Sequence, residues 1–557
     1  MELVQAREIK GKYQIHDDKK LNGVHYTPKE LADFTADRIL SSFNLKSKKV
    51  ISIFDPAVGD GELLKSLAQK ILAKGIDVKV YGLDIDKEAI KSATKRIKEI
   101  KSGLEVRIEQ KDFTTSDVNS KFDLVIANPP YVRTQALGTK NTSSLSEQYS
   151  LEGRIDLYYV FLMGIQKYMH SESVAGFIVS NRFMTTKSGA PVRSGLLKDY
   201  SFAEIYDFGD TKIFEAAVLP AVLVFKLKES EQQKSKFASI YSSKSTQTAD
   251  CKDVYTAVLQ GNGLYRIGDQ TFEVKNGLLR EESDQRVVWS ISNDDTDEWA
   301  RKVEENTFCS FGQIGKIRVG VKTTADKVFI SKNWSSLSPD QRPEKNILKK
   351  LITHHFAERF KENEGNTREI LYTHESVKGK KVAIDLSKFP KTWKYLNSHK
   401  KQLQAREYLI EAGRNWYEIW VPQEPSLWSK PKIVFRDICE RPTFWLDNSG
   451  AIVNGDCYWI TLNEEQNEED IWLVLAVANS KFIEDFYDHK FNNKLYSGRR
   501  RFMTQYVEQF PIPKLNASEK KKIISLTKKI FEAKPGNTDS LEANLDNLIY
   551  QAFGIKD

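Results

Sequence analysis

Short apolar segments alternate with amphipathic ones from about residue 20 to residue 230 of the chain. The apolar segments are continuous and rich in β-branched residues, which indicates buried strands of a parallel sheet. The amphipathic segments indicate helices, including 29–43, 61–74 and 87–100, and the alternation predicts a doubly wound, mostly parallel α/β sheet. The predicted strands are 50–54, 78–83, 105–108, 124–127, 177–179 and 222–225.

The pattern changes beyond about residue 250, where basic residues interleave with polar and aromatic ones. This predicts a mixed α+β domain, and the segment 226–252, rich in Lys, Ser, Gln and Thr, predicts a solvated connection before it. The tail is helical by pattern and is expected to close that domain, with Leu541, Leu545, Leu548 and Ile549 on one face. The expected organisation is a first domain over 1–240, a second over 250–515 and a helical segment over 516–557.

Composition and charge fit a protein with more than one domain. A chain of 557 residues is too long for one core, and 40% hydrophobic with 29% charged residues is ordinary for a globular protein. The widely spaced cysteines (Cys251, Cys309, Cys439 and Cys457) argue against a structural zinc site and for a reducing cytoplasm. No apolar stretch is long enough to span a bilayer, and the N-terminus lacks a secretory pattern. The net charge of +8 permits a polyanionic partner without requiring one.

Four residues, Asn128-Pro129-Pro130-Tyr131, follow the predicted strand 124–127 and carry most of the chemical information. Proline stops the strand and stiffens the chain beyond it. An Asn carboxamide, a proline-locked carbonyl and an aromatic ring then lie at the carboxyl end of a strand, where open α/β sheets bind their ligands. Two rigid acceptors suit both N–H bonds of an exocyclic amine, and the ring suits stacking on the base that carries it.

The first predicted strand leads into a loop that contains Asp55, Ala57, Gly59 and Gly61. Glycines one residue apart let the backbone turn tightly and approach a ligand at a helix N-terminus. With Asp55, Asp60 and Glu62, the loop is a poor site for a pyrophosphate. It suits a cationic ligand such as S-adenosylmethionine, which carries a sulfonium and an ammonium group. The alternative is a solvated acidic loop.

Acidic residues also follow the second and third predicted strands. Asp84 is placed to accept hydrogen bonds from ribose hydroxyls, with Ile85 beside the adenine of the cofactor, whereas Asp86 is expected to cap the next helix. Asp112 is a candidate to bind the amino group of that adenine, and Phe113 to pack on its ring. A simple turn is the alternative interpretation of this pair.

Upstream of these strands, the segment Tyr26-Thr27-Pro28 precedes the predicted helix 29–43. Thr27 is expected to cap this helix, and Pro28 fits its first turn. The same segment is a candidate to contact the methionine end of the cofactor.

In this order the motifs resemble those of the γ-class amino-group DNA methyltransferases, particularly the TaqI-type adenine-N6 enzymes. The similarity includes YTP at 26–28, DPAVGDG at 55–61, GLDID at 82–86, KDF at 111–113 and NPPY at 128–131. It is strong over about 20–230 and continues more weakly to the C-terminus. One departure is the loop at 57–61, where the family more often reads ACGSG, but both glycines are kept.

The resemblance implies an S-adenosylmethionine-dependent catalytic domain over 1–240 and a DNA target-recognition domain over 250–515. It implies that methyl transfer proceeds without a covalent enzyme intermediate and without a metal ion. The implied cofactor-binding residues are Tyr26, Thr27, Pro28, Asp55, Ala57, Gly59, Gly61, Asp84, Ile85, Asp112, Phe113, Asn128 and Pro130.

The resemblance also implies the chemistry of the catalytic motif. Asn128 and the backbone carbonyl of Pro129 would accept hydrogen bonds from the target amino group and localise its lone pair for in-line attack on the methyl group. Tyr131 and Phe214 would stack on the target base. That base is inaccessible inside a duplex, so it must be flipped out, at a cost on the order of a few kcal/mol.

Three basic segments of the second half are candidates for contacts with double-stranded DNA. Each alone is typical of an ordinary surface loop, but together they resemble the TaqI-type specificity domain. The candidate residues are Lys316, Arg318, Lys322, Lys432, Arg436, Lys494, Arg499, Arg500 and Arg501. Only 25 residues precede the YTP segment, which is too short for a nuclease domain. We therefore expect a cytoplasmic, prokaryotic modification enzyme whose cognate restriction endonuclease acts separately.

Other targets stay open at this point, because NPPY suits any planar amine or amide. They are cytosine N4, an RNA adenine and a protein glutamine amide. Glutamine methyltransferases are shorter and lack a basic second half, and cytosine-N4 enzymes more often have Ser or Asp in place of Asn128. A catalytically silent DNA-binding module predicts loss of the cofactor loop or of the acceptor, and both are present. The function best supported is adenine-N6 methylation of DNA in a restriction–modification or phage-defence system.

Overall fold

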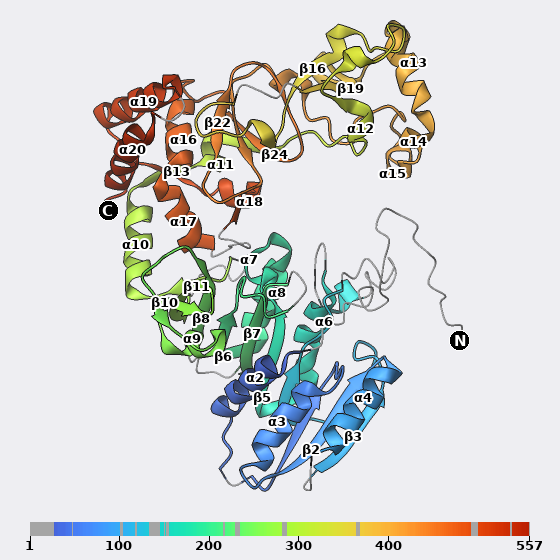
Figure 1. Ribbon diagram of the computed structural model, residues 1–557, viewed down its shortest axis with the longest axis vertical. Helices are drawn as coiled ribbons and strands as arrows, with labels where there is room; N and C mark the ends of the chain where they lie inside the picture. Colours follow the sequence, from blue (N-terminus) through green and yellow to red (C-terminus); the bar gives the residue numbers. More distant parts are fainter. Residues whose placement is uncertain are drawn as a thin grey trace. The chain divides into compact units, whose positions relative to one another are not determined.

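The computed structural model forms two compact units, Met1–Asn293 and Asp294–Asp557, each with its own sheets and hydrophobic core (Figure 1). It describes residues 27–46, 48–100, 104–116, 120–132, 145–149, 151, 155–214, 218–228, 234–280, 287–363, 368–491, 499–534 and 537–555.

One continuous sheet runs through the first unit. Its order is β3-β2-β1-β4-β5-β7-β6-β8-β11-β10-β9, with β12 beside β11. The strands are β1 (Val50–Asp55), β2 (Asp77–Asp84), β3 (Leu104–Gln110), β4 (Phe122–Ala127), β5 (Met169–Ser180), β6 (Tyr200–Asp207), β7 (Pro220–Leu227), β8 (Lys236–Ser243), β9 (Ala249–Asp250), β10 (Gly263–Ile267), β11 (Gln270–Leu279) and β12 (Ile291–Ser292). Strands β3 to β5 are parallel, and β7 runs antiparallel to both β5 and β6.

Helices cover both faces of this sheet and bury two apolar clusters against it (Figure 1). One face carries α2 (Lys29–Ser42), α3 (Glu62–Leu72), α4 (Lys87–Lys98) and α9 (Val254–Gln260). The other carries α6 (Leu157–Gly164), α7 (Arg182–Thr185) and α8 (Ala190–Asp199), with short turns η2 (Ile165–Tyr168) and η3 (Lys187–Gly189). The predicted doubly wound, mostly parallel α/β architecture is therefore confirmed.

The first unit extends further along the chain than the sequence indicated. We expected its end at 240 and a solvated connection over 226–252, but β8 lies within that segment and pairs with β6. The hairpin β10–β11 then continues the sheet from β8. Because five consecutive residues of β8 are buried, its polar-looking sequence is part of the core, and the unit ends at Asn293.

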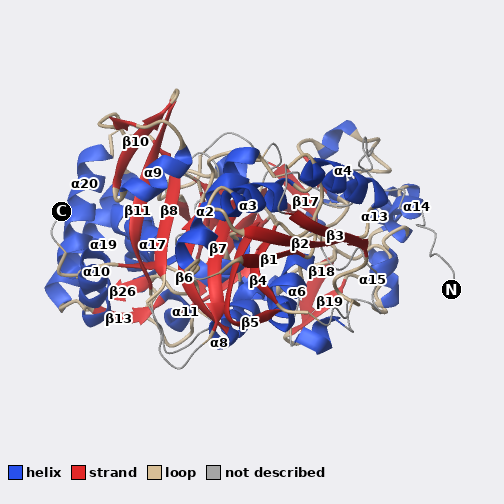
Figure 2. Cartoon of the chain, turned by 90° about the horizontal axis from the view of Figure 1, so that it is seen from below, coloured by secondary structure: helices blue, strands red, loops and turns tan. Residues whose placement is uncertain are grey.

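The second unit is built from small sheets and surrounding helices, as the red strands and blue helices of Figure 2 show. The first four-stranded sheet contains, in order, β14 (Gly315–Val319), β24 (Cys457–Leu462), β20 (Lys432–Arg436) and β22 (Phe444–Asp447). The second contains β15 (Ile330–Ser331), β17 (Arg368–Leu371), β16 (Leu348–Ile352) and β23 (Ile452–Val453). The strand pairs are β13 (Thr307–Ser310) with β26 (Pro511–Pro513), β18 (His374–Val377) with β19 (Lys380–Ala383), and β21 (Ile438–Cys439) with β25 (Arg500–Arg501).

The helices of the second unit confirm the predicted mixed α+β class. They are α10 (Asp294–Glu305), α11 (Phe311–Ile314), α12 (Asp326–Phe329), α13 (Pro390–Ser398), α14 (Lys400–Gln404), α15 (Glu407–Glu411), α16 (Asp470–Asn479), α17 (Lys481–Phe491), α18 (Thr504–Val507), α19 (Ala517–Glu532) and α20 (Asp539–Ala552). Short 3-10 turns are η4 (Trp334–Ser336), η5 (Lys345–Ile347), η6 (His354–Phe356), η7 (Leu386–Lys388) and η8 (Pro425–Leu427). The tail forms two helices, and α19 packs on α16 within this unit.

A buried polar cluster joins the loops of the second unit. The Arg406 guanidinium donates to the backbone carbonyls of Leu403, Thr323, Glu418 and Trp416. Burial alone would raise the pKa of the Glu418 carboxyl, but hydrogen bonds from His374, the Asn415 amide and Arg414 lower it to about 2. Burial also lowers the pKa of His374, although the neighbouring Glu418 acts in the opposite direction.

We expect acid to destabilise the second unit through this cluster. The folded pKa of Glu418 is about 2 against an ordinary value of 4.5, so its stabilising contribution is lost as the pH falls from about 4.5 towards 2. His374 adds a loss below its ordinary 6.5, because the unfolded ring binds a proton more readily. Urea unfolding followed by tryptophan fluorescence measures this, since nine of the ten tryptophans, all but Trp289, lie in the second unit.

The matched pair of variants is Glu418→Gln and Glu465→Gln. Glu465 is exposed, so its replacement should leave the pH dependence unchanged, whereas Glu418→Gln should flatten it below pH ~4.5. Equal slopes in the two variants would show that another group causes the acid sensitivity.

Candidate functional site

The carboxyl ends of the parallel strands bring the predicted motifs to one edge of the first unit's sheet. β1 ends at Asp55, β2 at Asp84, and β4 directly before Asn128. β1 lies between β2 and β4, so the strand order reverses at this point. Such a reversal is where open α/β sheets form their ligand sites.

The loop after β1 has a conformation that favours glycine. Gly59 and Gly61 have φ angles of +53° and +83°, in the left-handed region. A Cβ on Gly61 would lie 2.9 Å from the Cα and Cβ of Ala93 on α4. The Val58 N–H donates to the Leu83 carbonyl at 2.8 Å, which ties the loop to β2. The backbone is therefore held close to the sheet edge, with α3 starting directly behind it.

Asp55 is fully buried at the base of this loop, with 0% of its surface exposed. Its Oδ1 accepts from the Ala57 N–H at 2.9 Å, whereas Oδ2 has no hydrogen-bond partner in the part of the chain that the structure describes. Burial raises the pKa of this carboxyl well above its ordinary value, and the charges of Asp84 and Asp60 add to the effect. A cationic group bound beside Oδ2 would satisfy this atom and favour the carboxylate.

Asp60 and Glu62 contribute less negative charge than the sequence indicated. The Nη1 of Arg96 on α4 lies 3.0 Å from Asp60 Oδ2 and also pairs with Glu62. One guanidinium offsets one of these two negative charges, so the loop is less acidic than its sequence suggests.

Asp84 and Ile85 form the neighbouring part of the edge. Asp84 Oδ2 accepts from the Gly59 N–H at 2.9 Å, and Oδ1 accepts from the Asp86 N–H at 2.9 Å. Ile85 is 69% exposed. A fixed carboxylate beside an exposed apolar side chain suits a nucleoside, with its ribose on the one and its base on the other. Asp86 accepts from the Glu88 N–H at 2.8 Å, which confirms it as the cap of α4.

Asp112 and Phe113 follow β3. The exposed Asp112 accepts at Oδ1 from both the N–H and the hydroxyl of Thr114 at 2.8 Å, which makes a local turn. Phe113 is 5% exposed and stacks on Phe161 with ring centroids 4.6 Å apart. Phe113 offers little of its ring to a ligand in this conformation, so packing on an adenine stays a prediction.

Two hydroxyl groups contact the Asn128 carboxamide. Its Nδ2 donates to Thr27 Oγ1 at 3.1 Å, and the Tyr131 hydroxyl donates to its Oδ1 at 2.8 Å. The prediction that Thr27 caps α2 is wrong, because Pro28 is the cap residue and makes no side-chain hydrogen bond. Local spacing gave no signal for the Thr27–Asn128 contact, which joins residues 101 positions apart.

The Tyr131 side chain, predicted to stack on the target base, is held by contacts within the protein. Its hydroxyl lies 3.2 Å from the carbonyl of Ile178 on β5, and its ring packs edge-on to Tyr158 at 5.8 Å. Burial raises the pKa of this phenol far above its ordinary value. In this structure the hydroxyl therefore uses one of the two lone pairs of Asn128 Oδ1, the oxygen that the motif offers to a substrate amine.

Phe214 lies in the hydrophobic core on the α2 face of the sheet and is 6% exposed. Tyr131 packs against the core on the α6 face. Phe214 is buried and Tyr131 is half-buried, and their stacking on one base stays a prediction. Tyr26, predicted to contact the cofactor, lies outside the described residues.

Comparison with known proteins covers both units. Residues 63–214 match the Eco57I restriction-modification methylase, and residues 375–512 match the TaqI-like C-terminal specificity domain. The type II methyltransferase M.BanIII of Aneurinibacillus aneurinilyticus is 35% identical over 569 residues, which cover 97% of this chain and 98% of the relative. The chain belongs to the type II methyltransferase family.

More distant members of the type II methyltransferase family also align over most of the chain. M.PaeR7I of Pseudomonas aeruginosa is 23% identical, covering 88% of this chain and 86% of the relative. The solved structure of the type IIL restriction-modification enzyme MmeI in complex with DNA matches with a TM-score of 0.66 and 14% identity, over 97% of this chain and 78% of that chain. At this identity the likeness shows a shared fold. The resemblance to the TaqI-type family is confirmed by the two domain matches and by M.BanIII.

The basic residues predicted to contact DNA in this type II methyltransferase differ in exposure. Lys316, Lys322 and Arg499 are exposed. Arg318 is half-buried, with its guanidinium 5.0 Å from the centre of the Trp459 ring. Arg436 is half-buried, and its Nε has no hydrogen-bond partner among the described residues. These residues stay candidates for DNA contacts, whereas Lys494 lies outside the described residues.

Lys432 is not available to a ligand. Its side chain is 0% exposed, and its Nζ lies 2.6 Å from Asp447 Oδ2 and donates to the Trp428 carbonyl at 2.9 Å. Because β20 lies between β24 and β22, Lys432 is in the interior of the sheet, and Asp447 on β22 neutralises its charge.

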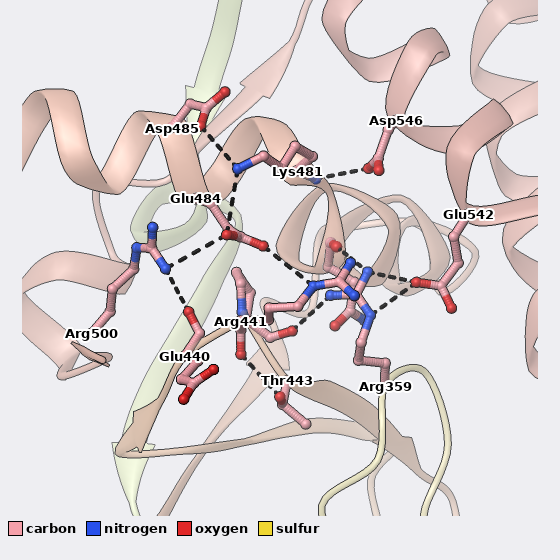
Figure 3. Close-up of polar contacts among 12 residues, drawn as sticks. Arg359, Glu440, Arg441, Thr443, Lys481, Glu484, Asp485, Arg500, Glu542 and Asp546 are labelled. Carbon is pink, nitrogen blue, oxygen red and sulfur yellow. Dashed lines mark hydrogen bonds and ion pairs between the residues drawn. The ribbon is translucent and has the colours of Figure 1, made fainter. Parts of the chain in front are cut away.

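Arg500 is also a structural residue. Its Nε and Nη2 each donate to the Asp488 carboxylate at 2.8 Å, and Nη1 lies 3.5 Å from Glu484 Oε2. Figure 3 shows this guanidinium in a polar network with Glu484 and Lys481 of α17. The network continues through Arg359, whose Nη2 lies 2.8 Å from Glu542 of α20. Arg501 pairs with Asp437 at 3.1 Å and is partly exposed. The predicted DNA contact of Arg500 is therefore replaced by a role in holding the second unit together.

The described residues contain no group of three or more His, Cys, Asp or Glu side chains arranged to hold a metal ion. No helix among these residues is long and apolar enough to cross a membrane.

Proposed function

We propose that this type II methyltransferase transfers the methyl group of S-adenosylmethionine to the N6 amino group of adenine in double-stranded DNA. The observation that carries the proposal is Asn128 at the end of β4, at the same sheet edge as Asp55 and Asp84. A rigid carboxamide acceptor beside a nucleoside-binding edge suits the methylation of an amino group on a base. Membership in the type II methyltransferase family supports methyl transfer as the reaction.

The residues at this edge fit S-adenosylmethionine. Asp84 would accept from the ribose hydroxyls, and the exposed Ile85 would pack on the adenine. The unpaired Oδ2 of Asp55 would accept from the ammonium group. Gly59 and Gly61 let the backbone approach the ligand, because neither has a Cβ. Bound there, the cofactor supplies an electrophilic methyl group.

Asn128 Oδ1 and the Pro129 carbonyl would accept the two N–H bonds of the target amine. Two such hydrogen bonds favour a tetrahedral nitrogen and localise its lone pair for attack. Positioning and fixed dipoles then supply the catalysis without a general base. Asn128 Oδ1 already accepts one hydrogen bond from the Tyr131 hydroxyl, and its second lone pair would accept from the target amine.

Double-stranded DNA is the proposed substrate because the second unit matches a specificity domain. The amino group of a paired base cannot reach Asn128, so we propose that the enzyme flips the base out of the duplex. We further propose that it acts in the bacterial cytoplasm as the modification enzyme of a restriction–modification system, with cleavage supplied by a separate chain.

The test is methyl transfer from labelled S-adenosylmethionine to unmethylated duplex DNA, followed by nucleoside analysis and sequencing of the modified positions. We expect N6-methyladenine at one recurrent site. Detection of N4-methylcytosine instead would show that the target is the N4 amino group of cytosine. Transfer to RNA or protein, with none to DNA, would overturn the proposed substrate.

Thr27 offers a test of how Asn128 is oriented. Thr27→Val removes the hydroxyl that accepts from Asn128 Nδ2, and we expect kcat to fall roughly 5- to 10-fold, the value of one hydrogen bond. The Kd for S-adenosylmethionine should stay within about twofold, and Thr27→Ser should restore kcat. A weaker cofactor Kd with unchanged kcat would instead place Thr27 in the cofactor pocket.

A further inference from the structure

A two-stranded ribbon projects from the second unit. β18 and β19 pair with each other, and no other described strand joins them. Val377 pairs with Lys380 across the turn residues Lys378 and Gly379. Their φ angles of +52° and +73° are those of a type I′ turn, which matches the natural twist of a hairpin. The ribbon is therefore preformed, and its strands are labelled β18 and β19 in Figure 2.

The tip of this ribbon is exposed on both faces. Every residue from Glu375 to Val382 is exposed, including Val377 at 46% and Val382 at 37%. A two-stranded ribbon alone is only marginally stable in water, and exposed valines add little to its stability. The composition of the tip is thus not explained by packing within the unit.

The charge of the tip is uncompensated. Lys378, Lys380 and Lys381 form no ion pair with a carboxylate in the described parts of the chain, and Glu375 is the acidic residue nearest to them on the ribbon. Other lysines of this unit are neutralised, such as Lys430 by Glu464 at 3.1 Å. The tip therefore offers three free cations to a polyanion.

The register divides the side chains between the two faces. Val377 is opposite Lys380, and Glu375 is opposite Val382, so these four residues share one face. Ser376 and Lys381 are opposite each other on the other face. One face thus combines two valines with the Glu375 acceptor and Lys380, whereas Lys381 lies on the other face and Lys378 in the turn.

We propose that the ribbon Glu375–Val382 enters the major groove of the substrate duplex. This inference rests on the proposed function, which makes duplex DNA the substrate. The major groove admits a two-stranded ribbon, and its base edges include thymine methyl groups that suit valine and cytosine amino groups that suit Glu375. Lys378, Lys380 and Lys381 bind the phosphates on either side.

The first test removes the charge. Lys378→Ala, Lys380→Ala and Lys381→Ala are combined in the full-length enzyme, and duplex binding is measured over a range of salt concentrations. We expect binding at least about tenfold weaker at low salt and a slope of log Kd against log salt smaller by about 3, one unit for each phosphate contact. Because these side chains are exposed, their replacement should leave the melting temperature unchanged.

The matched control removes three other lysines. Lys521, Lys522 and Lys529 on α19 are exposed and form no ion pair with another described residue. Their combined replacement by Ala changes the net charge equally and should leave the salt slope as in the wild type. Equal effects of the two triple variants would overturn the proposal, because the loss would then reflect net charge alone.

The second test examines the groove. Val377→Thr with Val382→Thr keeps the charge, so the salt slope should persist while the preference for the specific site over random duplex falls.

Dimethyl sulfate probes guanine N7 in the major groove, and protection by the wild type should be lost in the lysine variant. Protection that persists would overturn the proposal. If the wild type methylates DNA and the lysine variant binds DNA normally, the role of the ribbon is refuted but the proposed function stands. If the wild type neither binds nor methylates duplex DNA, the proposed function itself is refuted.

Discussion

Asn128→Ala is expected to reduce kcat for methyl transfer by at least about 100-fold, because loss of one fixed acceptor in a preorganised site costs roughly 100- to 1,000-fold. Binding of duplex DNA should stay within about threefold, since the DNA contacts are proposed to come from the second unit. Single-turnover methyl transfer with saturating S-adenosylmethionine separates the chemical step from binding.

Asn128→Asp is the informative companion variant. It keeps an acceptor oxygen at the end of β4 but loses the Nδ2 that donates to Thr27. We expect a rate between those of the wild type and the Ala variant. If Asn128→Ala lowers DNA binding and the melting temperature together with kcat, Asn128 supports the fold and the acceptor mechanism is refuted.

The convergence of Asp55, Asp84 and Asn128 could be predicted because it depends on local rules. Each follows a short apolar segment, and parallel strands place their carboxyl ends at the same edge of a sheet. The cap formed by Asp86 is local in the same way. The match to the methyltransferase family then identifies methyl transfer as the reaction, which the local rules leave open.

Contacts between distant segments could not be predicted in this way. Thr27 looks like a helix cap when only its neighbours are considered, but its hydroxyl bonds to Asn128 across the fold. Likewise, an aromatic residue after NPP suggests a stacking surface, and nothing local indicates that Tyr131 donates to Asn128 Oδ1. Side-chain hydrogen bonds between segments require the tertiary arrangement.

The burial of charged residues and of polar strands could not be predicted for a related reason. The segment around Lys432 looks like a basic surface loop, but β20 is an inner strand, and Lys432 is paired across it with Asp447 of β22. The boundary at 240 was misplaced because β8 is polar in sequence and is buried only once β6 and β11 flank it. Burial of a strand depends on its neighbours in the sheet, which composition alone does not identify.

Arg500→Ala is expected to lower the free energy of unfolding of the second unit by about 3–5 kcal/mol. The Arg500 side chain is 9% exposed and that of Asp488 12%, and removing the guanidinium takes away its two hydrogen bonds to the Asp488 carboxylate at 2.8 Å. Glu484 also loses a cation 3.5 Å away, although Lys481 and Arg441 remain at the same distance (Figure 3). Urea unfolding followed by tryptophan fluorescence measures the loss in this unit.

The control is the preceding residue. Arg499 is exposed, and Arg499→Ala should change the free energy of unfolding by no more than about 0.5 kcal/mol, as is typical of surface positions. If DNA contacts involve this arginine run, the Arg499 variant should weaken binding at unchanged stability, whereas the Arg500 variant should lose stability first. An Arg500→Ala protein that unfolds like the wild type but binds DNA less tightly would return Arg500 to the DNA interface and show that the pair with Asp488 contributes little.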